Sequence, residues 1–309
     1  MRVLLTGAGG FVGREVIPLL LRSGAEVHTL GRSSIGHPNV EHHSVDLLAC
    51  VDARLIQEIG ATHLLHLAWE TGPGFWHAPE NLDWVAASIN LVCAFVRGGG
   101  KRAVIAGSCA EYDWTGEGRL EETVSPVLPA TLYGAAKASV YAVLAKAAPG
   151  LGLSLAWARI FFPYGPGERP ERLLGTLLEA ARDGGVAKVS DGLQRRDFIH
   201  VEDVAAALLA ILTAPVEGVL NVASGEAVPV RRFVEIATRA AGSADRVAYG
   251  AIPTRPDDPP LIEGAIGRLL TETGYRPRFT LTTGVADAVA RFGLGGNINK
   301  VVKGPVRTD

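Results

Sequence analysis

The sequence predicts an α/β fold in which a doubly wound parallel sheet is joined to a smaller α/β C-terminal lobe. Short apolar strands alternate with helical segments through the first half of the chain, and a glycine-rich turn follows the first strand. Alternating strands and helices build parallel sheets with helices on both faces. After Pro163-Tyr-Gly-Pro166 the alternation becomes irregular, which indicates the second lobe.

The first strand and the turn after it predict a dinucleotide site. Val3–Thr6 leads directly into Gly7, Gly10 and Gly13, and an apolar helical pattern follows over residues 12–23. In such a turn one glycine permits the sharp bend, another admits the pyrophosphate, and the third lets helix and strand pack closely. Free N–H groups at the start of the helix then bind the pyrophosphate. We therefore expect a Rossmann-type sheet.

The other elements follow in order along the chain. In the first lobe we expect strands at Glu26–Leu30, Glu41–Val45, His63–Leu67, Ala103–Ala106 and Leu153–Ala158, and helices near residues 52–59, 80–97 and 130–148. In the second lobe we expect a helix at Leu173–Asp183, a strand pair at Val186–Asp191 and Asp197–His200, a helix at Val201–Thr213, a strand at Val219–Val222 and a helix at Val230–Ala241.

These elements divide the chain into three parts. Residues 1–165 are expected to form a dinucleotide-binding domain. Residues 166–294 are expected to form the substrate lobe, with some segments returning to the main sheet. Residues 295–309 have little pattern and are expected to be a flexible tail.

The composition is typical of a globular protein and does not indicate nucleic acid or membrane binding. The 309 residues carry a formal net charge of −2, so no electrostatic attraction to polyanions is expected. No apolar run approaches the ~20 residues of a membrane span, and Met1-Arg2 enters a strand rather than a signal peptide. The 3 cysteines, Cys50, Cys93 and Cys109, fit neither metal-ligand spacing nor a disulfide framework. We expect a cytoplasmic enzyme without a metal at its site.

Tyr133 and Lys137 are the first catalytic candidates. Both lie in a helical segment, where a spacing of one turn places them on the same face. A neighbouring ammonium stabilises a phenolate, so we expect Lys137 to lower the pKa of Tyr133. Such a tyrosine exchanges a proton with a substrate oxygen while a hydride moves to or from the carbon. On spacing alone, however, such a pair is more often part of a solvated helix face.

Several motifs together resemble those of one family. The glycine turn, Ser108, the Tyr133 and Lys137 pair, Arg195-Arg-Asp-Phe198 and Arg255-Pro-Asp-Asp258 are similar to motifs of the extended short-chain dehydrogenase/reductases. That family includes the NAD(P)-dependent epimerases and dehydratases that act on nucleotide sugars. The resemblance covers about residues 1–292 and implies a nucleotide-sugar substrate.

The resemblance also implies roles for individual residues. Ser108 would be the third catalytic residue and would hydrogen-bond the reacting oxygen, and Lys137 would also hold the nicotinamide ribose. Asp46 matches the aspartate that contacts adenine. The remaining cofactor contacts would be Gly7, Gly10, Phe11, Val12, Gly13, Leu47, Ala68 and Tyr133. The substrate contacts would be Trp69, Tyr112 and two phosphate-binding arginines, Arg196 and Arg255.

The end of the second strand bears on the choice between NAD and NADP. Enzymes that prefer NAD usually have an acidic residue there, which accepts hydrogen bonds from the ribose 2′-hydroxyl. This chain has Gly31 at that position, followed by Arg32 and Ser33. A guanidinium and a hydroxyl suit a 2′-phosphate. We therefore expect NADP, with NAD as the alternative.

The two positions after Ser108 bear on the reaction. Sugar 4,6-dehydratases of the family have Asp-Glu there, whereas this chain has Cys109 and Ala110. Alanine moves no proton, which argues against dehydration. The cysteine-dependent 3,5-epimerases place their cysteine two residues after the serine, so Cys109 does not match them. Reduction of a nucleotide-linked 4-keto-6-deoxyhexose, with Tyr133 as general acid, needs only the three residues that remain.

Three other hypotheses stay open. An NAD-dependent 4-epimerase of nucleotide sugars needs the same three residues. A non-catalytic NAD(P) sensor would fit the fold, although degenerate relatives usually lose the tyrosine or the lysine. Reduction of a small ketone or aldehyde would leave Arg196 and Arg255 without a phosphate.

The loop after the fourth predicted strand is rich in aromatic residues. Phe75, Trp76 and His77 either line the substrate pocket or pack locally under the loop. Glu70, His77 and Glu111 are polar candidates near the pocket without an assigned role. The resemblance further implies a homodimer that pairs through the helices near residues 80–97 and 130–148.

Overall fold

A computed structural model describes residues 1–49, 51–116, 118–254 and 258–294 of the chain. Its centre is a seven-stranded sheet in the order β10-β6-β5-β4-β1-β2-β3, with every neighbouring pair parallel. The strands are β1 (Arg2–Thr6), β2 (Glu26–Gly31), β3 (Val40–Ser44), β4 (His63–His66), β5 (Arg102–Ser108), β6 (Ser154–Ile160) and β10 (Gly218–Val222). The strand order reverses between β1 and β4, which confirms the predicted doubly wound sheet.

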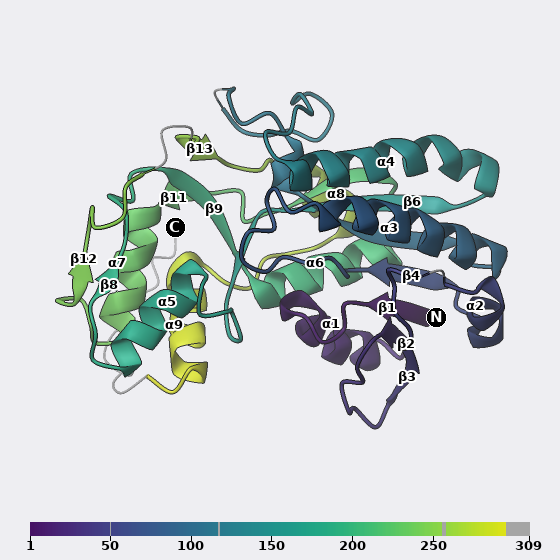
Figure 1. Cartoon of the computed structure of the whole chain (residues 1–309), viewed down its shortest axis with the longest axis horizontal. Helices are drawn as coiled ribbons and strands as arrows, with labels where there is room; N and C mark the ends of the chain where they lie inside the picture. Colours follow the sequence, from purple (N-terminus) through teal and green to yellow (C-terminus); the bar gives the residue numbers. More distant parts are fainter. Residues whose placement is uncertain (50, 117, 255–257, 295–309) are drawn as a thin grey trace, which may run out of the picture.

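Helices cover both faces of this sheet (Figure 1). One face carries α1 (Phe11–Arg22), α6 (Val201–Thr213) and α8 (Gly267–Thr273), and the other carries α2 (Ala53–Ile59), α3 (Glu80–Arg97) and α4 (Leu132–Leu151). Side chains of a strand alternate between the two cores: Val3 and Leu5 pack with α1 and α6, and Leu4 packs on the opposite side. Both faces of β1 are therefore buried, as its continuous apolar run predicts.

Local sequence fixes where α2 and α4 begin and end. The Asp52 side chain accepts the Arg54 N–H and caps α2, and the Thr131 hydroxyl accepts the Gly134 N–H and caps α4. Both helices end at a glycine in the left-handed conformation. The Thr131 cap therefore starts α4 just before Tyr133.

The second lobe lies to one side of the sheet (Figure 1). It contains α5 (Leu173–Arg182), α7 (Val230–Ala240), α9 (Leu281–Arg291) and the strands β7 (Phe162–Tyr164), β8 (Ala187–Lys188), β9 (Arg195–His200), β11 (Ala227–Pro229), β12 (Val247–Ala248) and β13 (Leu261–Ile262). Leu177, Phe233 and Val285, one from each helix, are buried in a shared core. This lobe therefore has apolar packing of its own.

The strand pairing of the second lobe differs from the prediction. The predicted strand pair does not form: β8 pairs with β12, and β9 pairs with β7, β11 and β13. The strands that pair with β8 and β9 come from other segments of the chain. A sequence pattern within one segment does not identify its pairing partner. Strand β10 returns to the main sheet beside β6.

Two predictions concern residues outside the described ranges, namely the role of Arg255 and the flexible tail at 295–309. Within the described ranges, no helix is both long enough and apolar enough to cross a membrane.

Candidate active site

The candidate site lies at the carboxyl edge of the sheet, where β1, β4 and β5 end. The glycine turn follows β1, Ala68 and Trp69 follow β4, and Ser108 is the last residue of β5. Tyr133 and Lys137 come from the first turns of α4, which packs on the short 3-10 helix η1 (Cys109–Glu111). In open α/β sheets ligands bind at this edge, where the strand order reverses.

The glycine turn after β1 has a backbone that side chains would obstruct. Gly7 has a φ of 73°, and a Cβ on it would lie 2.8 Å from the Ala68 nitrogen. A Cβ on Gly13 would lie 2.1 Å from the Gly7 carbonyl oxygen, so α1 packs on the turn only because residue 13 has no side chain. A Cβ on Gly9 would meet only Ile35, at 3.9 Å, so the turn is open above this residue. The turn therefore fits a pyrophosphate at the start of α1.

Ser108 is held by its strand and by the turn after it. It pairs in register with Ile160 of β6, and its hydroxyl accepts the Ala110 N–H at 3.2 Å. Its own backbone N–H donates to Glu111 Oε1 at 2.7 Å. These reciprocal bonds form a capping box that fixes the serine where the strand ends.

The Glu111 carboxylate lies inside the protein, behind Ser108. It accepts hydrogen bonds from Trp157 Nε1 at 2.9 Å and from Arg159 Nε at 2.8 Å. Glu111 is 0% exposed and Arg159 is 1% exposed. Burial opposes the charge of Arg159, yet the carboxylate holds the pKa of Arg159 above its ordinary value. Glu111 therefore supports the end of β5 from inside the protein. It is not the polar pocket residue that the sequence suggested.

Three aromatic side chains surround Tyr133. The ring centroids of Trp69, Phe75 and Trp76 lie 6.2, 4.9 and 5.7 Å from that of Tyr133, and each ring is nearly perpendicular to it. The Tyr133 N–H donates to the Trp76 carbonyl at 3.0 Å, which ties the aromatic loop to the start of α4. The loop therefore packs on the candidate catalytic tyrosine and forms one wall of the site.

Burial sets the protonation of Tyr133 and Lys137. Removal from water raises the pKa of Tyr133, and the adjacent Ser108 hydroxyl acts in the opposite direction. Burial lowers the pKa of Lys137 to about 7. Lys137 Nζ donates to the Ala106 carbonyl at 2.8 Å and lies 3.8 Å from the Trp69 ring centroid. The lowered pKa expected for Tyr133 is therefore wrong for this structure, because the lysine nitrogen is directed at Ala106 and Trp69.

The strand ends on the other side of the glycine turn carry the residues expected to contact adenosine. Gly31 is the last residue of β2, and Arg32 and Ser33 follow it with exposed side chains. Asp46 and Leu47 follow β3, which pairs with β2. The sheet thus brings the four expected contacts, Arg32, Ser33, Asp46 and Leu47, to the same edge as the glycine turn.

The match to a family model covers most of this architecture. The model described as "NAD dependent epimerase/dehydratase family" matches residues 3–223, a span that includes the whole glycine turn, Ser108, Tyr133 and Lys137. The chain belongs to this family.

Relatives of similar length support the assignment. A UDP-glucose 4-epimerase from Corynebacterium glutamicum is 26% identical over 94% of this chain and 95% of its own length. A dTDP-6-deoxy-L-talose 4-dehydrogenase (NAD(+)) from Aggregatibacter actinomycetemcomitans is 25% identical over 86% of this chain and 100% of its own length. The solved structure of MoeE5 in complex with UDP-glucose and NAD is 29% identical, with a TM-score of 0.83 over 94% of this chain and 98% of that one. These family members differ in reaction, so the activity must be argued from the site.

In this member of the family, Arg196 is held by its own lobe. It is buried on β9, its Nη2 lies 2.6 Å from Asp258 Oδ1, and its Nη1 donates to the Pro259 carbonyl at 2.7 Å. A phosphate at this position would share the guanidinium with that carboxylate. Arg255, the other arginine expected to bind phosphate, lies outside the described residues.

Tyr112 is not placed as a substrate contact. It is 1% exposed, and its hydroxyl donates to Asn221 Oδ1 at 2.8 Å. The Arg159 guanidinium carbon lies 4.2 Å from the centroid of its ring. The contacts with Asn221 and Arg159 thus hold Tyr112 in the interior. Trp69, the other predicted aromatic contact, lies beside Lys137 in the site.

Cys109, Glu70 and His77 are three further candidates from the sequence. Burial raises the pKa of Cys109, so its thiol stays protonated and is no base. Glu70 and His77 are exposed, and Glu70 lies 3.8 Å from Arg169 at the surface. None of the three side chains is directed at Tyr133 by a hydrogen bond within the described residues.

Two residues beside the site carry no sequence signal. Arg172, at the start of α5, lies 5.6 Å from the Phe75 ring centroid, and its charge opposes the rise that burial causes in the pKa of Tyr133. His66, at the end of β4, bridges Thr6 Oγ1 at 2.6 Å and Ser88 Oγ at 2.9 Å, and burial lowers its pKa to about 3. A single arginine in a loop and a single histidine in a strand form no recognisable motif.

Proposed function

We propose that this enzyme reduces the 4-keto group of a nucleotide-linked 4-keto-6-deoxyhexose by hydride transfer. The observation that supports this proposal best is that Ser108, Tyr133 and Lys137 share one edge of the sheet while Cys109 and Ala110 follow the serine. The first three residues suffice for exchanging a proton and a hydride at one carbinol group. Ala110 carries no proton-exchanging group and the Cys109 thiol is buried, so elimination of water lacks an acid and a base.

The proposed cofactor is NADP, with NAD as the alternative. Gly31 has no side-chain carboxylate that could accept a hydrogen bond from a ribose 2′-hydroxyl. Arg32 and Ser33 supply exposed hydrogen-bond donors for a 2′-phosphate. The other residues proposed to hold the dinucleotide are Gly7, Gly10, Phe11, Val12, Gly13, Asp46, Leu47 and Ala68. The NAD found with MoeE5 supports the alternative.

The chain supplies the proton and the positioning for this reaction. When bound, the nicotinamide supplies the hydride. Burial, which raises the pKa of Tyr133, keeps its phenol protonated, so Tyr133 can donate that proton to the ketone oxygen. The Ser108 hydroxyl lies next to the Tyr133 hydroxyl, so it is proposed to donate to the same ketone oxygen. Lys137, whose Nζ now donates to the Ala106 carbonyl, is proposed to hold the nicotinamide ribose.

The second lobe is proposed to hold the nucleotide diphosphate. Arg196 and Arg255 are its expected phosphate contacts, and Arg172 brings a further guanidinium next to the aromatic wall of the site. The sugar would then pack against Trp69. Under this proposal the residues up to about 165 bind the dinucleotide and the later residues bind the substrate, except for segments such as β10 that return to the main sheet.

A nucleotide-sugar 4-epimerase is the second candidate. It is favoured by the similarity to the UDP-glucose 4-epimerase of Corynebacterium glutamicum over 94% of this chain. An epimerase would use Tyr133 in both directions, first taking the proton from the sugar hydroxyl and then returning it to the turned keto sugar. Its cofactor would stay bound throughout, so added NADPH would not be consumed.

We also propose a homodimer through α3 and α4, which lie side by side on the outside of the first lobe (Figure 1). Leu82 of α3 and Val143 of α4 are 61% and 52% exposed, and pairing would cover such side chains. The cytoplasmic location stays a prediction.

Absorbance of NADPH with a panel of nucleotide-linked 4-keto-6-deoxyhexoses tests the proposed function. Stoichiometric loss of absorbance, abolished in Tyr133→Phe, supports the reductase. Unchanged NADPH together with equilibration of nucleotide hexoses and their 4-epimers replaces it with the epimerase. Cofactor binding without any turnover would indicate a sensor. If nucleoside diphosphates do not protect the protein against heat, reduction of a small ketone becomes the better hypothesis.

A further inference from the structure

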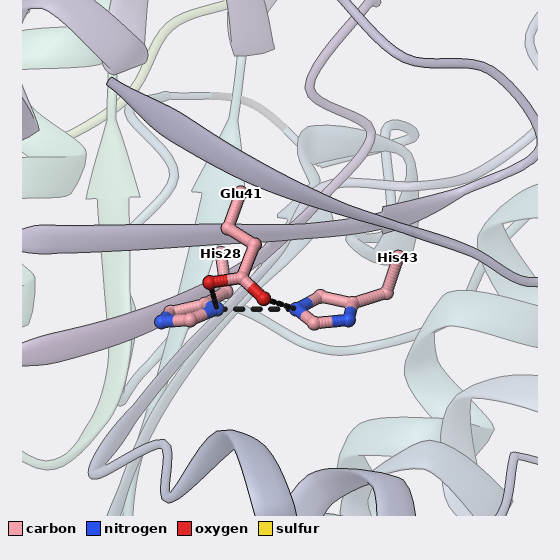
Figure 2. Close-up of side chains that lie close together, drawn as sticks. All are labelled: His28, Glu41 and His43. Carbon is pink, nitrogen blue, oxygen red and sulfur yellow. Dashed lines mark hydrogen bonds and ion pairs between the residues drawn. The ribbon is translucent and has the colours of Figure 1, made fainter. Parts of the chain in front are cut away.

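Three side chains at the far edge of the sheet form a cluster that the proposed function does not use. His28 comes from β2, and Glu41 and His43 come from β3 (Figure 2). The strand register pairs His28 with Glu41, and His43 follows two residues later on the same face. Among the described residues, this is the only group of three or more His, Cys, Asp or Glu side chains whose ligand atoms all lie within 4.8 Å.

The two imidazole nitrogens and the carboxylate lie near the separations of tetrahedral zinc ligands, with a different oxygen of Glu41 facing each histidine. His28 Nδ1 lies 3.1 Å from His43 Nε2 and 3.6 Å from Glu41 Oε2, and His43 Nε2 lies 3.7 Å from Glu41 Oε1. Zinc–ligand bonds of about 2.0–2.2 Å place tetrahedral ligand atoms about 3.3–3.6 Å apart. Figure 2 shows the carboxylate spanning the two facing nitrogens, with one oxygen directed at each. Small side-chain rotations therefore bring all three groups onto one ion.

The surroundings orient His28 as a ligand. Its other ring nitrogen, Nε2, lies 3.1 Å from Glu26 Oε1, and Glu26 is held in turn by Arg2 Nε at 2.8 Å. A carboxylate on one ring nitrogen keeps the proton there and leaves the lone pair of the other nitrogen for a metal. His28 is buried, whereas the Glu41 side chain is 66% exposed, so an ion can reach the cluster from solvent.

We propose that His28, Glu41 and His43 form a binding site for a divalent transition metal ion, with Zn²⁺ as the best fit. Two imidazoles and one carboxylate suit zinc, whereas magnesium and calcium prefer oxygen ligands alone. The ion replaces the hydrogen bond between the two histidines and takes water as its fourth ligand. It cross-links the edge strand β3 to β2.

The site is separate from the candidate active site. Strand β5, which carries Ser108, is separated from β2 and β3 by β4 and β1. At about 4.8 Å per strand, the two sites are about 14–19 Å apart across the sheet. The proposed ion therefore stabilises the strand ends that carry Arg32 and Asp46, and it takes no part in the reaction.

The test is a zinc titration of the full chain, freed of any histidine tag and stripped with a chelator, against a chromophoric competitor. We expect one Zn²⁺ per chain and a melting temperature that rises with zinc concentration. Glu41→Gln and His43→Ala should each weaken binding at least about tenfold, and Glu26→Gln should weaken it about 10- to 100-fold. Co²⁺ in place of zinc should give the visible absorption of a tetrahedral site.

The control is His42→Ala, which removes an imidazole from the same strand. His42 lies on the opposite face of β3, 3.0 Å from Thr29 Oγ1, so the variant should bind zinc like the wild type. Glu41 is exposed, so Glu41→Gln should fold normally even if a histidine variant does not. The proposal is overturned if the wild type shows no saturable binding, if Glu41→Gln binds as tightly as the wild type, or if His42→Ala weakens binding as much as His43→Ala.

Discussion

The Glu111 carboxylate lies 2.8 Å from Arg159 Nε, behind the strand end that carries Ser108. Both charged side chains are buried, and the same carboxylate accepts the Ser108 backbone N–H at 2.7 Å. A buried charge stabilises the fold only while its partner is present. This ion pair therefore couples the packing of the sheet to the position of the candidate catalytic serine.

Replacing Glu111 with glutamine leaves the Arg159 charge buried without a counter-ion. We expect Glu111→Gln to lower the free energy of unfolding by about 3–5 kcal/mol, measured by urea denaturation. We also expect kcat to fall, because the Ser108 N–H loses its charged acceptor. The control is Glu121→Gln, which changes an exposed carboxylate and should stay within about 0.5 kcal/mol of the wild type.

A double variant, Glu111→Leu with Arg159→Leu, separates the two effects of Glu111. Neither charge is then left unpaired, so much of the stability lost in Glu111→Gln should return. Turnover should stay low, because the Ser108 N–H still has no carboxylate. If turnover returned together with stability, Glu111 would have no positioning role.

Lys137 makes the stability of the protein depend on pH. Its pKa is about 7 in the folded protein, below the ordinary 10.5, so between these values the unfolded chain holds a proton that the folded chain has released. Stability contributed by this group therefore rises with pH across that window, by up to about 1.4 kcal/mol per pH unit. We expect Lys137→Met to remove this rise, measured as the free energy of unfolding from pH 7 to 9.5.

The matched control for this prediction is Lys146→Met on the same helix. Lys146 is exposed, and its replacement should leave the pH dependence of the wild type unchanged. A Lys137→Met variant whose stability follows the wild type at every pH would show that the lysine is not buried as described.

The end of β2 allows a direct change of cofactor preference. A Cβ on Gly31 would meet no atom within 4 Å, so Gly31→Asp fits without rearrangement. Its carboxylate would bind a ribose 2′-hydroxyl and repel a 2′-phosphate. We expect the ratio of dissociation constants to shift about tenfold or more toward NADH, measured by fluorescence titration of both cofactors. Gly150→Asp, at the open end of α4, should leave the ratio unchanged, and a Gly31→Asp variant that still prefers NADPH would argue against the proposed 2′-phosphate site.

The sheet could be predicted from the sequence because its signals are local. Strands such as β1 and β5 are short, largely apolar runs followed by a turn, and the predicted helix at Val201–Thr213 coincides with α6. Pairing in the second lobe could not be predicted, because the partners of β9 come from segments on both sides of it in the chain. Such pairing depends on the packed lobe rather than on any single segment.

The candidate site could be predicted in part. Spacing and strand ends indicated Ser108, Tyr133 and Lys137, which the sheet brings to one edge. The pKa of Tyr133 could not be predicted, because burial has the largest effect on it and the spacing to Lys137 carries no information about burial. The inward position of Glu111 depends on Trp157 and Arg159, which lie on another strand and have no motif relation to it.

Deuterium transfer tests the central claim most directly. The chain is incubated with NADPH deuterated at the transferred position and a nucleotide-linked 4-keto-6-deoxyhexose, and the product is analysed by mass spectrometry and NMR. We expect one deuterium at carbon 4 of each product molecule. We also expect the rate to fall by about 10²- to 10⁴-fold in Tyr133→Phe while that variant still binds NADPH. A reduced product without deuterium at carbon 4, or a Tyr133→Phe variant that turns over at the wild-type rate, would contradict the proposed function.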